Sequence, residues 1–286
     1  MEILTAPAAV RDDVAHARGR GASVALVPTM GDLHDGHLSL VTAGRRRADV
    51  LVASIFVNPL QFGPGEDFQS YPRALERDAG TLEAAGVDLL FAPTAEAIYP
   101  RGLAATTRVE VPELTSILCG AARPGHFTGV ATVVNILFNI VRPDLALFGE
   151  KDYQQLRIIR RMVADLQMDV EVVGLPTRRA PDGLALSSRN RYLSVAERVR
   201  APQLYYTLRD IALALERGAR DTGALERDAA ARLAAAGFTV DYVSIREAET
   251  LASPGPGTRA FVVLGAARLG AARLIDNVAA TAANTP

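Results

Sequence analysis

The stretch SVALVPTMGDLHDGH, residues 23–37, decides the fold. Residues 23–28 are an apolar run of strand length, and a helical pattern begins at Gly36 after a glycine-containing turn. A strand that is apolar at successive positions, and not only at alternate ones, indicates burial on both faces, as in a parallel sheet covered by helices. This stretch therefore predicts the first strand, turn and helix of an α/β fold.

The same alternation continues through the first 175 residues. We expect strands at residues 50–57, 87–92, 145–148 and 170–173, and helices at residues 36–48, 72–85, 129–141 and 152–166. Apolar strands that alternate with helices predict a Rossmann-like, doubly wound parallel sheet. Ligands of such sheets bind at the carboxyl ends of the strands, so the residues that follow each strand are candidates for a functional site.

The pattern changes after Gly174-Leu175-Pro176. Two alanine-rich helices and then three strands are expected at residues 195–217, 222–236, 239–246, 259–263 and 272–278. Helices followed by strands indicate a smaller α+β domain. We therefore expect an N-terminal domain of residues 1–176 and a C-terminal domain of residues 177–286, whose last residues, 280–286, fray.

The composition indicates a globular protein with a substantial core. Of the 286 residues, 49% are apolar, and 31 basic residues balance 32 acidic ones to a net charge of −1. This balance gives no reason to expect a protein that binds nucleic acid or a membrane surface. The basic run Arg45–Arg47 is interpreted as a solvated helix end. Cys119 is the only cysteine, so an internal disulfide is excluded and a buried, inert thiol is expected.

The sequence predicts neither a signal peptide nor a transmembrane helix. No basic segment followed by an apolar stretch opens the chain. The longest apolar region, residues 130–141, is too short to cross a bilayer and contains Asn135 and Asn139. We therefore expect a soluble protein of the cytoplasm.

Two histidines stand where the first strand gives way to the first helix. His34 and His37 are three residues apart, so both rings lie on one side of a first helical turn. A helix N-terminus favours anions, and Gly31 and Gly36 allow the backbone to approach a phosphate closely. Phosphate chemistry is the favoured interpretation. The alternatives are a metal site, which no nearby cysteine or acidic pair would complete, and histidines of the core.

Lys151 is the only lysine in a chain that otherwise uses arginine for its basic residues. It follows the strand expected at residues 145–148, at the edge of the sheet where a phosphate would lie. A cation at the start of a helix opposes the helix dipole, so the position is locally unfavourable yet suited to a charged ligand. Chance retention of one lysine is the alternative.

Two polar loops complete the candidate site. In LSSRN, residues 186–190, two hydroxyls and a guanidinium suit a triphosphate, with a helix cap and turn as the alternative. In NPLQFG, residues 58–63, the amide of Gln61 suits hydroxyl and carboxylate groups, with loop capping as the alternative.

These segments resemble known families. His34-Asp35-Gly36-His37 resembles the HxGH element of the nucleotidyltransferase superfamily, whereas the GxGxxG and GxxxxGK[ST] patterns are absent from the sequence. In order, PTMGDLHDGH, NPLQFG, GEKDYQQ and LSSRN closely resemble the pantothenate synthetases (pantoate–β-alanine ligases). YPR at residues 71–73 and RPGHFTGV at residues 123–130 extend the resemblance over nearly the whole chain. Another nucleotidyltransferase, or a module that senses nucleotide without turnover, remains the alternative.

The resemblance implies an ATP-dependent ligase, active as a homodimer, that condenses pantoate with β-alanine through a pantoyl adenylate and releases AMP and pyrophosphate. It implies catalytic roles for His37, His34, Lys151 and Arg189. It implies substrate contacts for Pro28, Met30, Gln61 and Gln155. It implies ATP contacts for Met30, Gly31, Asp32, Leu33, His34, Asp35, Gly36, His37, Gly149, Glu150, Lys151, Asp152, Arg178, Leu186, Ser187, Ser188 and Arg189.

Two positions depart from the family pattern. Asp78 resembles the position associated with Mg²⁺, but Arg77 stands where some members carry an acidic neighbour. Arg178 replaces an expected aliphatic residue at a position whose backbone meets the adenine edge, and a backbone contact is compatible with that change.

Overall fold

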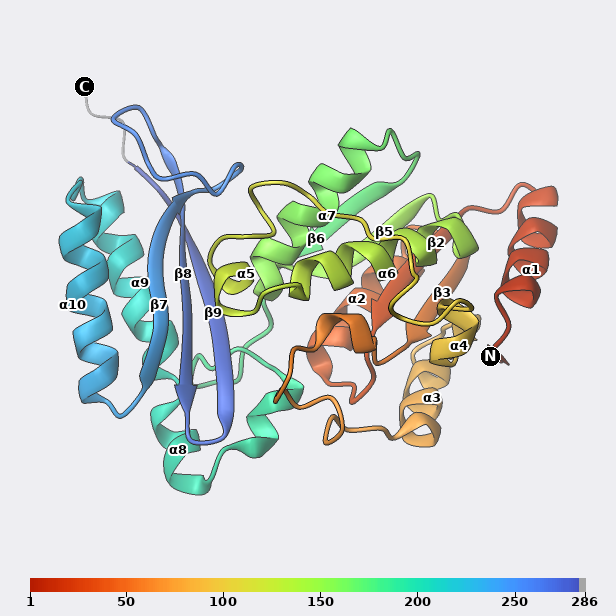
Figure 1. Ribbon diagram of the computed structural model, residues 1–286, viewed down its shortest axis with the longest axis horizontal. Helices are drawn as coiled ribbons and strands as arrows, with labels where there is room; N and C mark the ends of the chain where they lie inside the picture. Colours follow the sequence, from red (N-terminus) through yellow and green to blue (C-terminus); the bar gives the residue numbers. More distant parts are fainter. Residues whose placement is uncertain (283–286) are drawn as a thin grey trace. The chain divides into compact units, whose positions relative to one another are not determined.

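The computed structural model describes residues 1–282, which form two compact units (Figure 1). The first unit comprises Met1–Glu150 and Ile158–Pro176. The second comprises Lys151–Arg157 and the described chain from Thr177 onward. Of the residues expected to fray, 280 and 281 end a strand, and 283–286 lie outside the described residues.

A six-stranded parallel sheet forms the centre of the first unit, in the order β1-β4-β3-β2-β5-β6. Its strands are β1 (Glu2–Leu4), β2 (Val24–Thr29), β3 (Val50–Ile55), β4 (Leu89–Phe91), β5 (Leu145–Gly149) and β6 (Glu171–Leu175). The chain runs outward from β2 in one direction and then resumes at β5 on the other side of β2. The carboxyl ends of β2 and β5 therefore flank the switch point of the sheet, where ligands of doubly wound folds bind.

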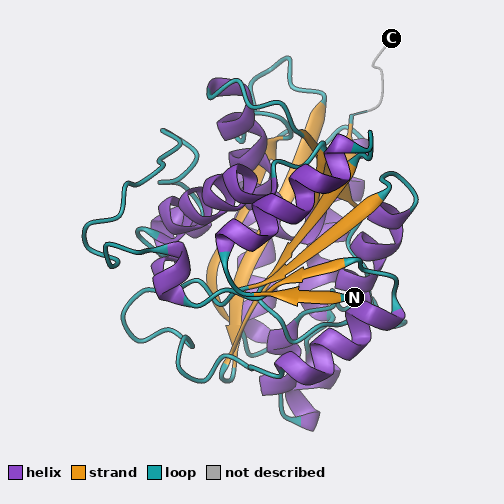
Figure 2. Ribbon diagram, turned by 90° about the vertical axis from the view of Figure 1, so that its right-hand side faces the viewer, coloured by secondary structure: helices purple, strands orange, loops and turns teal. Residues whose placement is uncertain are grey.

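Helices cover this sheet on both sides (Figure 2). They are α1 (Pro7–Gly19), α2 (Asp35–Arg45), α3 (Leu75–Ala84), α4 (Ala95–Ile98), α5 (Cys119–Ala122), α6 (His126–Val141) and α7 (Tyr153–Asp165), with 3₁₀ turns at Pro59–Gln61 (η1) and Glu150–Asp152 (η2). Leu51 and Leu147 from the strands and Leu82 from α3 are fully buried, so the apolar runs form the core. The predicted fold class is confirmed.

The second unit is a three-stranded antiparallel sheet packed against helices. The strands β7 (Thr239–Glu247), β8 (Ala260–Leu269) and β9 (Ala272–Thr281) pair in chain order. Its helices are α8 (Val195–Arg200), α9 (Gln203–Glu216) and α10 (Thr222–Ala235), and a 3₁₀ turn, η3, spans Ser188–Tyr192. Helix α9 packs on β8 and β9, where Leu208, Leu215 and Val263 form part of a separate core.

Several details differ from the sequence-based expectation. The single helix expected at residues 195–217 is wrong, because Pro202 lacks an N–H and separates α8 from α9. Strand β8 continues six residues past the expected end, because pairing with β9 carries residues 264–269, which include Gly265 and two alanines, into the sheet. Strand β1 and helix α1 were not expected, since β1 is three residues long and α1 has no side-chain N-cap. Within residues 1–282, no helix is both long and apolar enough to cross a membrane.

Candidate active site

The turn after β2 has a strained backbone. Gly31 and Asp32 have φ values of 83° and 51°, in the left-handed region that disfavours residues other than glycine. A β-carbon on Gly31 would lie 3.1 Å from Asp78 Oδ2 and 3.2 Å from the side chain of Ile55, so glycine is required. Strain of this kind persists only where surrounding contacts fix the backbone.

The carboxylate of Asp78, on α3, provides those contacts. Its Oδ2 accepts from Asp32 N at 2.7 Å and its Oδ1 accepts from Leu33 N at 3.2 Å. Arg77 donates both to Asp32 Oδ1 at 2.9 Å and to Asp78 Oδ1 at 3.2 Å, and these bonds raise the pKa of Arg77. Asp78 is only 1% exposed. Helix α3 thereby holds the turn in place.

This arrangement does not suit Mg²⁺. Both oxygens of Asp78 already accept hydrogen bonds from the backbone, and the adjacent residue carries a positive charge. Residues 1–282 contain no group of three or more histidine, cysteine, aspartate or glutamate side chains placed to hold a metal ion. The geometry assigns Asp78 to holding the turn.

His34 and His37 cap helix α2 reciprocally. His34 Nδ1 accepts from Gly36 N at 3.1 Å, and His37 Nδ1 accepts from His34 N at 3.3 Å. The two rings lie 4.1 Å apart, centroid to centroid. Because each Nδ1 accepts a backbone hydrogen, the neutral rings carry their protons on Nε2. The turn thus fixes two Nε2–H donors side by side at a helix N-terminus.

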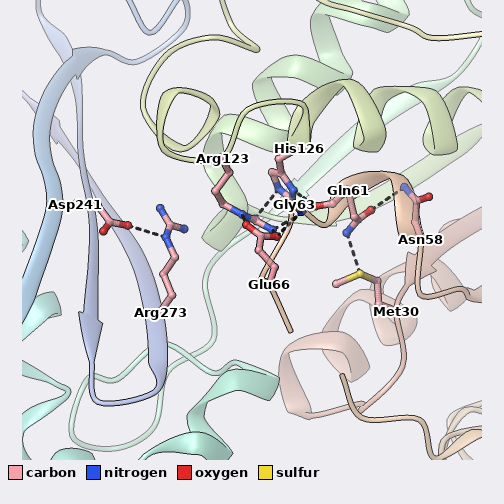
Figure 3. Close-up of polar contacts among 9 residues, drawn as sticks. All are labelled: Met30, Asn58, Gln61, Gly63, Glu66, Arg123, His126, Asp241 and Arg273. Atoms are coloured by element: carbon pink, nitrogen blue, oxygen red, sulfur yellow. Dashed lines mark hydrogen bonds and ion pairs between the residues drawn. The ribbon is translucent and has the colours of Figure 1, made fainter. Parts of the chain in front are cut away.

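Gln61, in η1, is oriented by a buried amide. Asn58 Nδ2 donates to Gln61 Oε1 and to Gly129 O, both at 3.1 Å, and its Oδ1 accepts from Tyr99 Oη at 2.7 Å. This leaves Gln61 Nε2 directed at Met30 Sδ, 2.9 Å away (Figure 3). Burial raises the pKa of Tyr99, so its hydroxyl remains a donor to Asn58.

The RPGHFTGV segment holds the backbone of Gln61. Arg123 forms a two-point ion pair with Glu66 at 2.6 Å, and His126 Nδ1 donates to Gln61 O at 2.7 Å (Figure 3). The carbonyl acceptor requires the Nδ1–H form of His126, which leaves Nε2 to accept from Arg123 at 3.0 Å. Although burial of Glu66 opposes it, the bond from Arg123 lowers the pKa of Glu66.

A cavity of about 280 Å³ lies in the first unit at the carboxyl ends of β3 and β4. Gly31 and Asp78 line it on one side, and Phe56, Phe68 and Arg73 are also part of its lining. It therefore borders the strained turn and is of a size to admit a small molecule.

The second unit brings Lys151 together with the LSSRN loop. A small cavity of about 10 Å³ is lined by both Lys151 and Ser187, with Asn190 and Asp276 beside them. Ser187 Oγ accepts from Arg189 N at 3.3 Å, so this hydroxyl caps η3, as the alternative interpretation expected. The Lys151 ammonium lies 3.8 Å from Asp152 Oδ2.

The sequence-predicted residues divide between the units. The first unit holds Pro28, Met30–His37, Gln61, Asp78, Gly149 and Glu150, and the second holds Lys151, Asp152, Gln155, Arg178 and Leu186–Arg189. Sequence reasoning missed the roles of Asn58, Tyr99, Glu66, Arg123 and His126. Asn58, Arg123 and His126 lie within quoted motifs, but their partners are up to 71 residues away in sequence.

Comparisons with known proteins place this chain among the members of one family. The family model for pantoate-beta-alanine ligase matches residues 2–279. The pantothenate synthetase of Pseudomonas entomophila (strain L48) is 58% identical over 269 residues, which cover 94% of each chain. That of Chromohalobacter salexigens is 59% identical over 265 residues, 92% of this chain and 93% of the relative.

Solved structures are also similar. The crystal structure of pantothenate synthetase from Thermus thermophilus has a TM-score of 0.90 and 49% identity, covering 97% of this chain and 99% of that one. The pantoate-beta-alanine ligase of Francisella tularensis, complexed with beta-gamma ATP and β-alanine, has a TM-score of 0.81 and 33% identity over 97% of each chain. The resemblance seen in the motifs is thereby confirmed, and the chain belongs to the pantoate–β-alanine ligase family.

Proposed function

We propose that the two units supply different groups to the ligase reaction of this family. The reaction is the ATP-dependent condensation of pantoate with β-alanine to pantothenate, through a pantoyl adenylate, with release of AMP and pyrophosphate. In this proposal the first unit binds pantoate through Gln61, Met30 and Pro28 and presents the two histidines. The second unit supplies Lys151, the LSSRN loop and a further pantoate contact from Gln155.

In the first step the carboxylate of pantoate attacks the α-phosphorus of ATP, and pyrophosphate leaves. Charge that develops on the phosphate oxygens is offset by the Nε2–H groups of His34 and His37 and by Lys151 and Arg189. Fixed donors aimed at developing charge lower the barrier because they need no reorganisation during the reaction. The remaining predicted ATP contacts, from the 30–37 turn, 149–152, Arg178 and 186–189, would hold the nucleotide.

In the second step the amine of β-alanine attacks the acyl carbon of the adenylate, and AMP leaves. The phosphate of the mixed anhydride is the leaving group, so no side-chain nucleophile is required. Cys119 is buried and has no role in this scheme. The fixed amide of Gln61 provides an Nε2–H donor for a carboxylate or hydroxyl group of a substrate.

One observation supports this scheme above the others: both histidines use Nδ1 to cap α2, so that Nε2–H is the donor that each ring presents at the helix N-terminus. The Francisella relative, complexed with beta-gamma ATP and β-alanine, supports these two molecules as substrates. Mg²⁺ is proposed only as a companion of the ATP phosphates, because Asp78 does not fit a metal ligand. A homodimer and a cytoplasmic location are likewise proposed from the family.

ATP–pyrophosphate exchange with pantoate, in the absence of β-alanine, tests the proposal. Exchange that requires pantoate, and that other hydroxy acids do not support, would establish the adenylation step and its acid together. A folded protein that binds ATP but exchanges with no acid would contradict the proposal. Exchange supported by a different acid would favour another nucleotidyltransferase reaction.

A further inference from the structure

Residues 151–157 pack with the second unit, although they follow directly on β5 of the first. Two side chain–main chain hydrogen bonds hold this segment. Asn277 Nδ2, from β9, donates to Lys151 O at 3.0 Å, and Tyr153 Oη donates to Ala248 O at 2.8 Å. The main chain of Lys151 is therefore attached to the C-terminal sheet.

Asn277 is itself held in place. It is 9% exposed, and its N–H donates to Asp276 Oδ1 at 2.8 Å. Arg179 donates to Asn277 O at 3.2 Å. Both the N–H and the C=O of Asn277 are thus engaged beside the bond that its side chain makes to Lys151.

Buried Asp276 and partly buried Arg179 form an ion pair next to Asn277. The guanidinium donates to Asp276 Oδ2 at 2.6 Å and to Oδ1 at 2.9 Å, and it stacks 4.0 Å from the ring centroid of Tyr205. Arg179 also donates to Gly183 O at 3.1 Å, in the segment that leads to the LSSRN loop. Burial raises the pKa of Asp276, and Arg179 opposes that rise. A pair of this kind is costly to desolvate and has a fixed geometry.

The Arg179–Asp276 ion pair lies next to both candidate phosphate-binding segments, which are Lys151 and the LSSRN loop. Asp276, Lys151 and Ser187 line one small cavity, and Arg179 and Ala185 form an isolated antiparallel β-bridge just before Ser187 in the chain. The lysine and the serine loop therefore share one support, built from β9 and the start of the C-terminal segment.

We propose that Asn277, supported by the Arg179–Asp276 pair, positions Lys151 for adenylation, so that Lys151 and Ser187–Arg189 act as one preorganised phosphate-binding group of the second unit. This rests on the role proposed for Lys151 above. Asn277 is a positioning residue, since it acts through the main chain of Lys151. The effect of Asn277 is therefore confined to adenylation, the step in which the triphosphate is bound.

The test separates the two half-reactions in Asn277→Ala. Pantoate-dependent ATP–pyrophosphate exchange is expected to fall about 10- to 100-fold, the effect of an ångström-scale misplacement of a catalytic group. Aminolysis of supplied pantoyl adenylate by β-alanine is expected to keep the rate of the parent chain, because no triphosphate takes part. A merely structural role would slow both half-reactions alike and would overturn the proposal.

A double-mutant cycle gives the second readout. Once Lys151→Ala has removed the ammonium, adding Asn277→Ala is expected to cause no further loss of exchange, whereas additive losses would contradict the coupling. If Asn277→Ala does not fold, Asn277→Leu keeps about the same volume, loses the donor and adds no charge, and the same outcomes apply. Glu226→Ala is the matched control, because Glu226 Oε1 accepts from Ile245 N at 2.7 Å, also a side chain–main chain bond of this unit.

The outcomes also separate this proposal from the proposed function. No pantoate-dependent exchange in the parent chain would refute the function itself. Normal exchange in Lys151→Ala would refute the role of the lysine, and with it the positioning role. Normal exchange in Asn277→Ala, alongside a defective Lys151→Ala, would refute the positioning role alone.

Discussion

At the residue scale, Asp78 illustrates how one carboxylate organises the turn after β2. Its two oxygens accept the N–H groups of Asp32 and Leu33, and the left-handed conformation of Asp32 depends on them. Substitution of Asp78 distinguishes two roles for its carboxylate. If the carboxylate binds Mg²⁺, the substitution raises the Mg²⁺ concentration that the reaction requires. If it only holds the backbone of the turn, that requirement does not change.

Asp78→Asn is expected to lower stability and to slow adenylation. The amide replaces an acceptor by a donor, so one buried N–H of the turn loses its partner, at about 1–3 kcal/mol of unfolding free energy. Denaturant unfolding measures this loss, and a Mg²⁺ titration of ATP–pyrophosphate exchange should give an unchanged half-saturating concentration. Glu76→Gln, the same chemical change on the exposed side of α3, is the control. A higher Mg²⁺ requirement at undiminished stability would return Asp78 to metal binding.

Lys151 offers a second residue-scale test, in which charge is kept and shape is changed. Lys151→Ala is expected to lower the adenylation rate by about 10²–10³-fold, the loss typical of one preorganised donor. Lys151→Arg should recover only part of this, because a planar fork does not replace a compact ammonium. Single-turnover formation of adenylate measures both. Full activity of the arginine variant would show that the reaction does not need an ammonium at this position, and that the single lysine is a chance feature of the composition.

At the scale of elements, the contact between α6 and η1 sets the position of Gln61. A β-carbon on Gly129 would clash with the carbonyl of Leu60, so only glycine lets the helix come this close. Gly129→Ala is expected to lower the unfolding free energy by about 1–3 kcal/mol, as overpacking does, and to weaken pantoate binding. Gly80→Ala is the control, since Gly80 lies in α3 with open space around it and alanine favours a helix by about 1 kcal/mol. Equal effects of the two substitutions would contradict this view of the contact.

The ion pair between Glu66 and Arg123 joins the loop after η1 to the segment before α6, and it predicts a pH dependence. The pKa of Glu66 is lower in the folded chain than its ordinary value of 4.5. The pair therefore stabilises the fold fully above that value and loses its effect as the pH falls through the lowered pKa. Chemical denaturation between about pH 7 and pH 3 should show the parent chain more stable than Glu66→Gln at the upper end, with the difference shrinking on acidification. A difference that widens at low pH would contradict the assignment.

The elements also show what the sequence predicts and what it does not. Apolar runs such as Val50–Ile55 and Leu145–Gly149 were located because their pattern is local. The motifs singled out His34, His37, Gln61 and Lys151 as candidate site residues. The contacts that support the site were not predicted. Asp78 was singled out only as a metal position and lies 46 residues from Asp32, and Asn277 is 126 residues from Lys151. Hydrogen bonds between residues so far apart depend on the tertiary fold, and no local sequence pattern predicts them.

At the scale of the whole molecule, the residues proposed for the reaction are divided between two compact units, with the histidine turn and Gln61 in the first and Lys151 and the LSSRN loop in the second. Each unit has its own sheet and its own core, so each can respond to its own ligand. A bound ligand suppresses the local opening reactions of the segments that it contacts, and amide hydrogen exchange reports such opening segment by segment.

Pantoate alone is therefore expected to slow amide exchange in the first unit, at residues 58–63 and 126–130, where Gln61 and its supports lie. Pyrophosphate alone is expected to slow exchange at residues 178–190 of the second unit, which support the LSSRN loop. Lys151→Ala should weaken the protection by pyrophosphate, because one of its proposed contacts is lost, and should leave the protection of residues 58–63 by pantoate intact. Protection of residues 178–190 by pantoate alone, to the same extent as by pyrophosphate, would contradict this division, because the protected segment would then not be the one that holds the proposed pantoate contact Gln61.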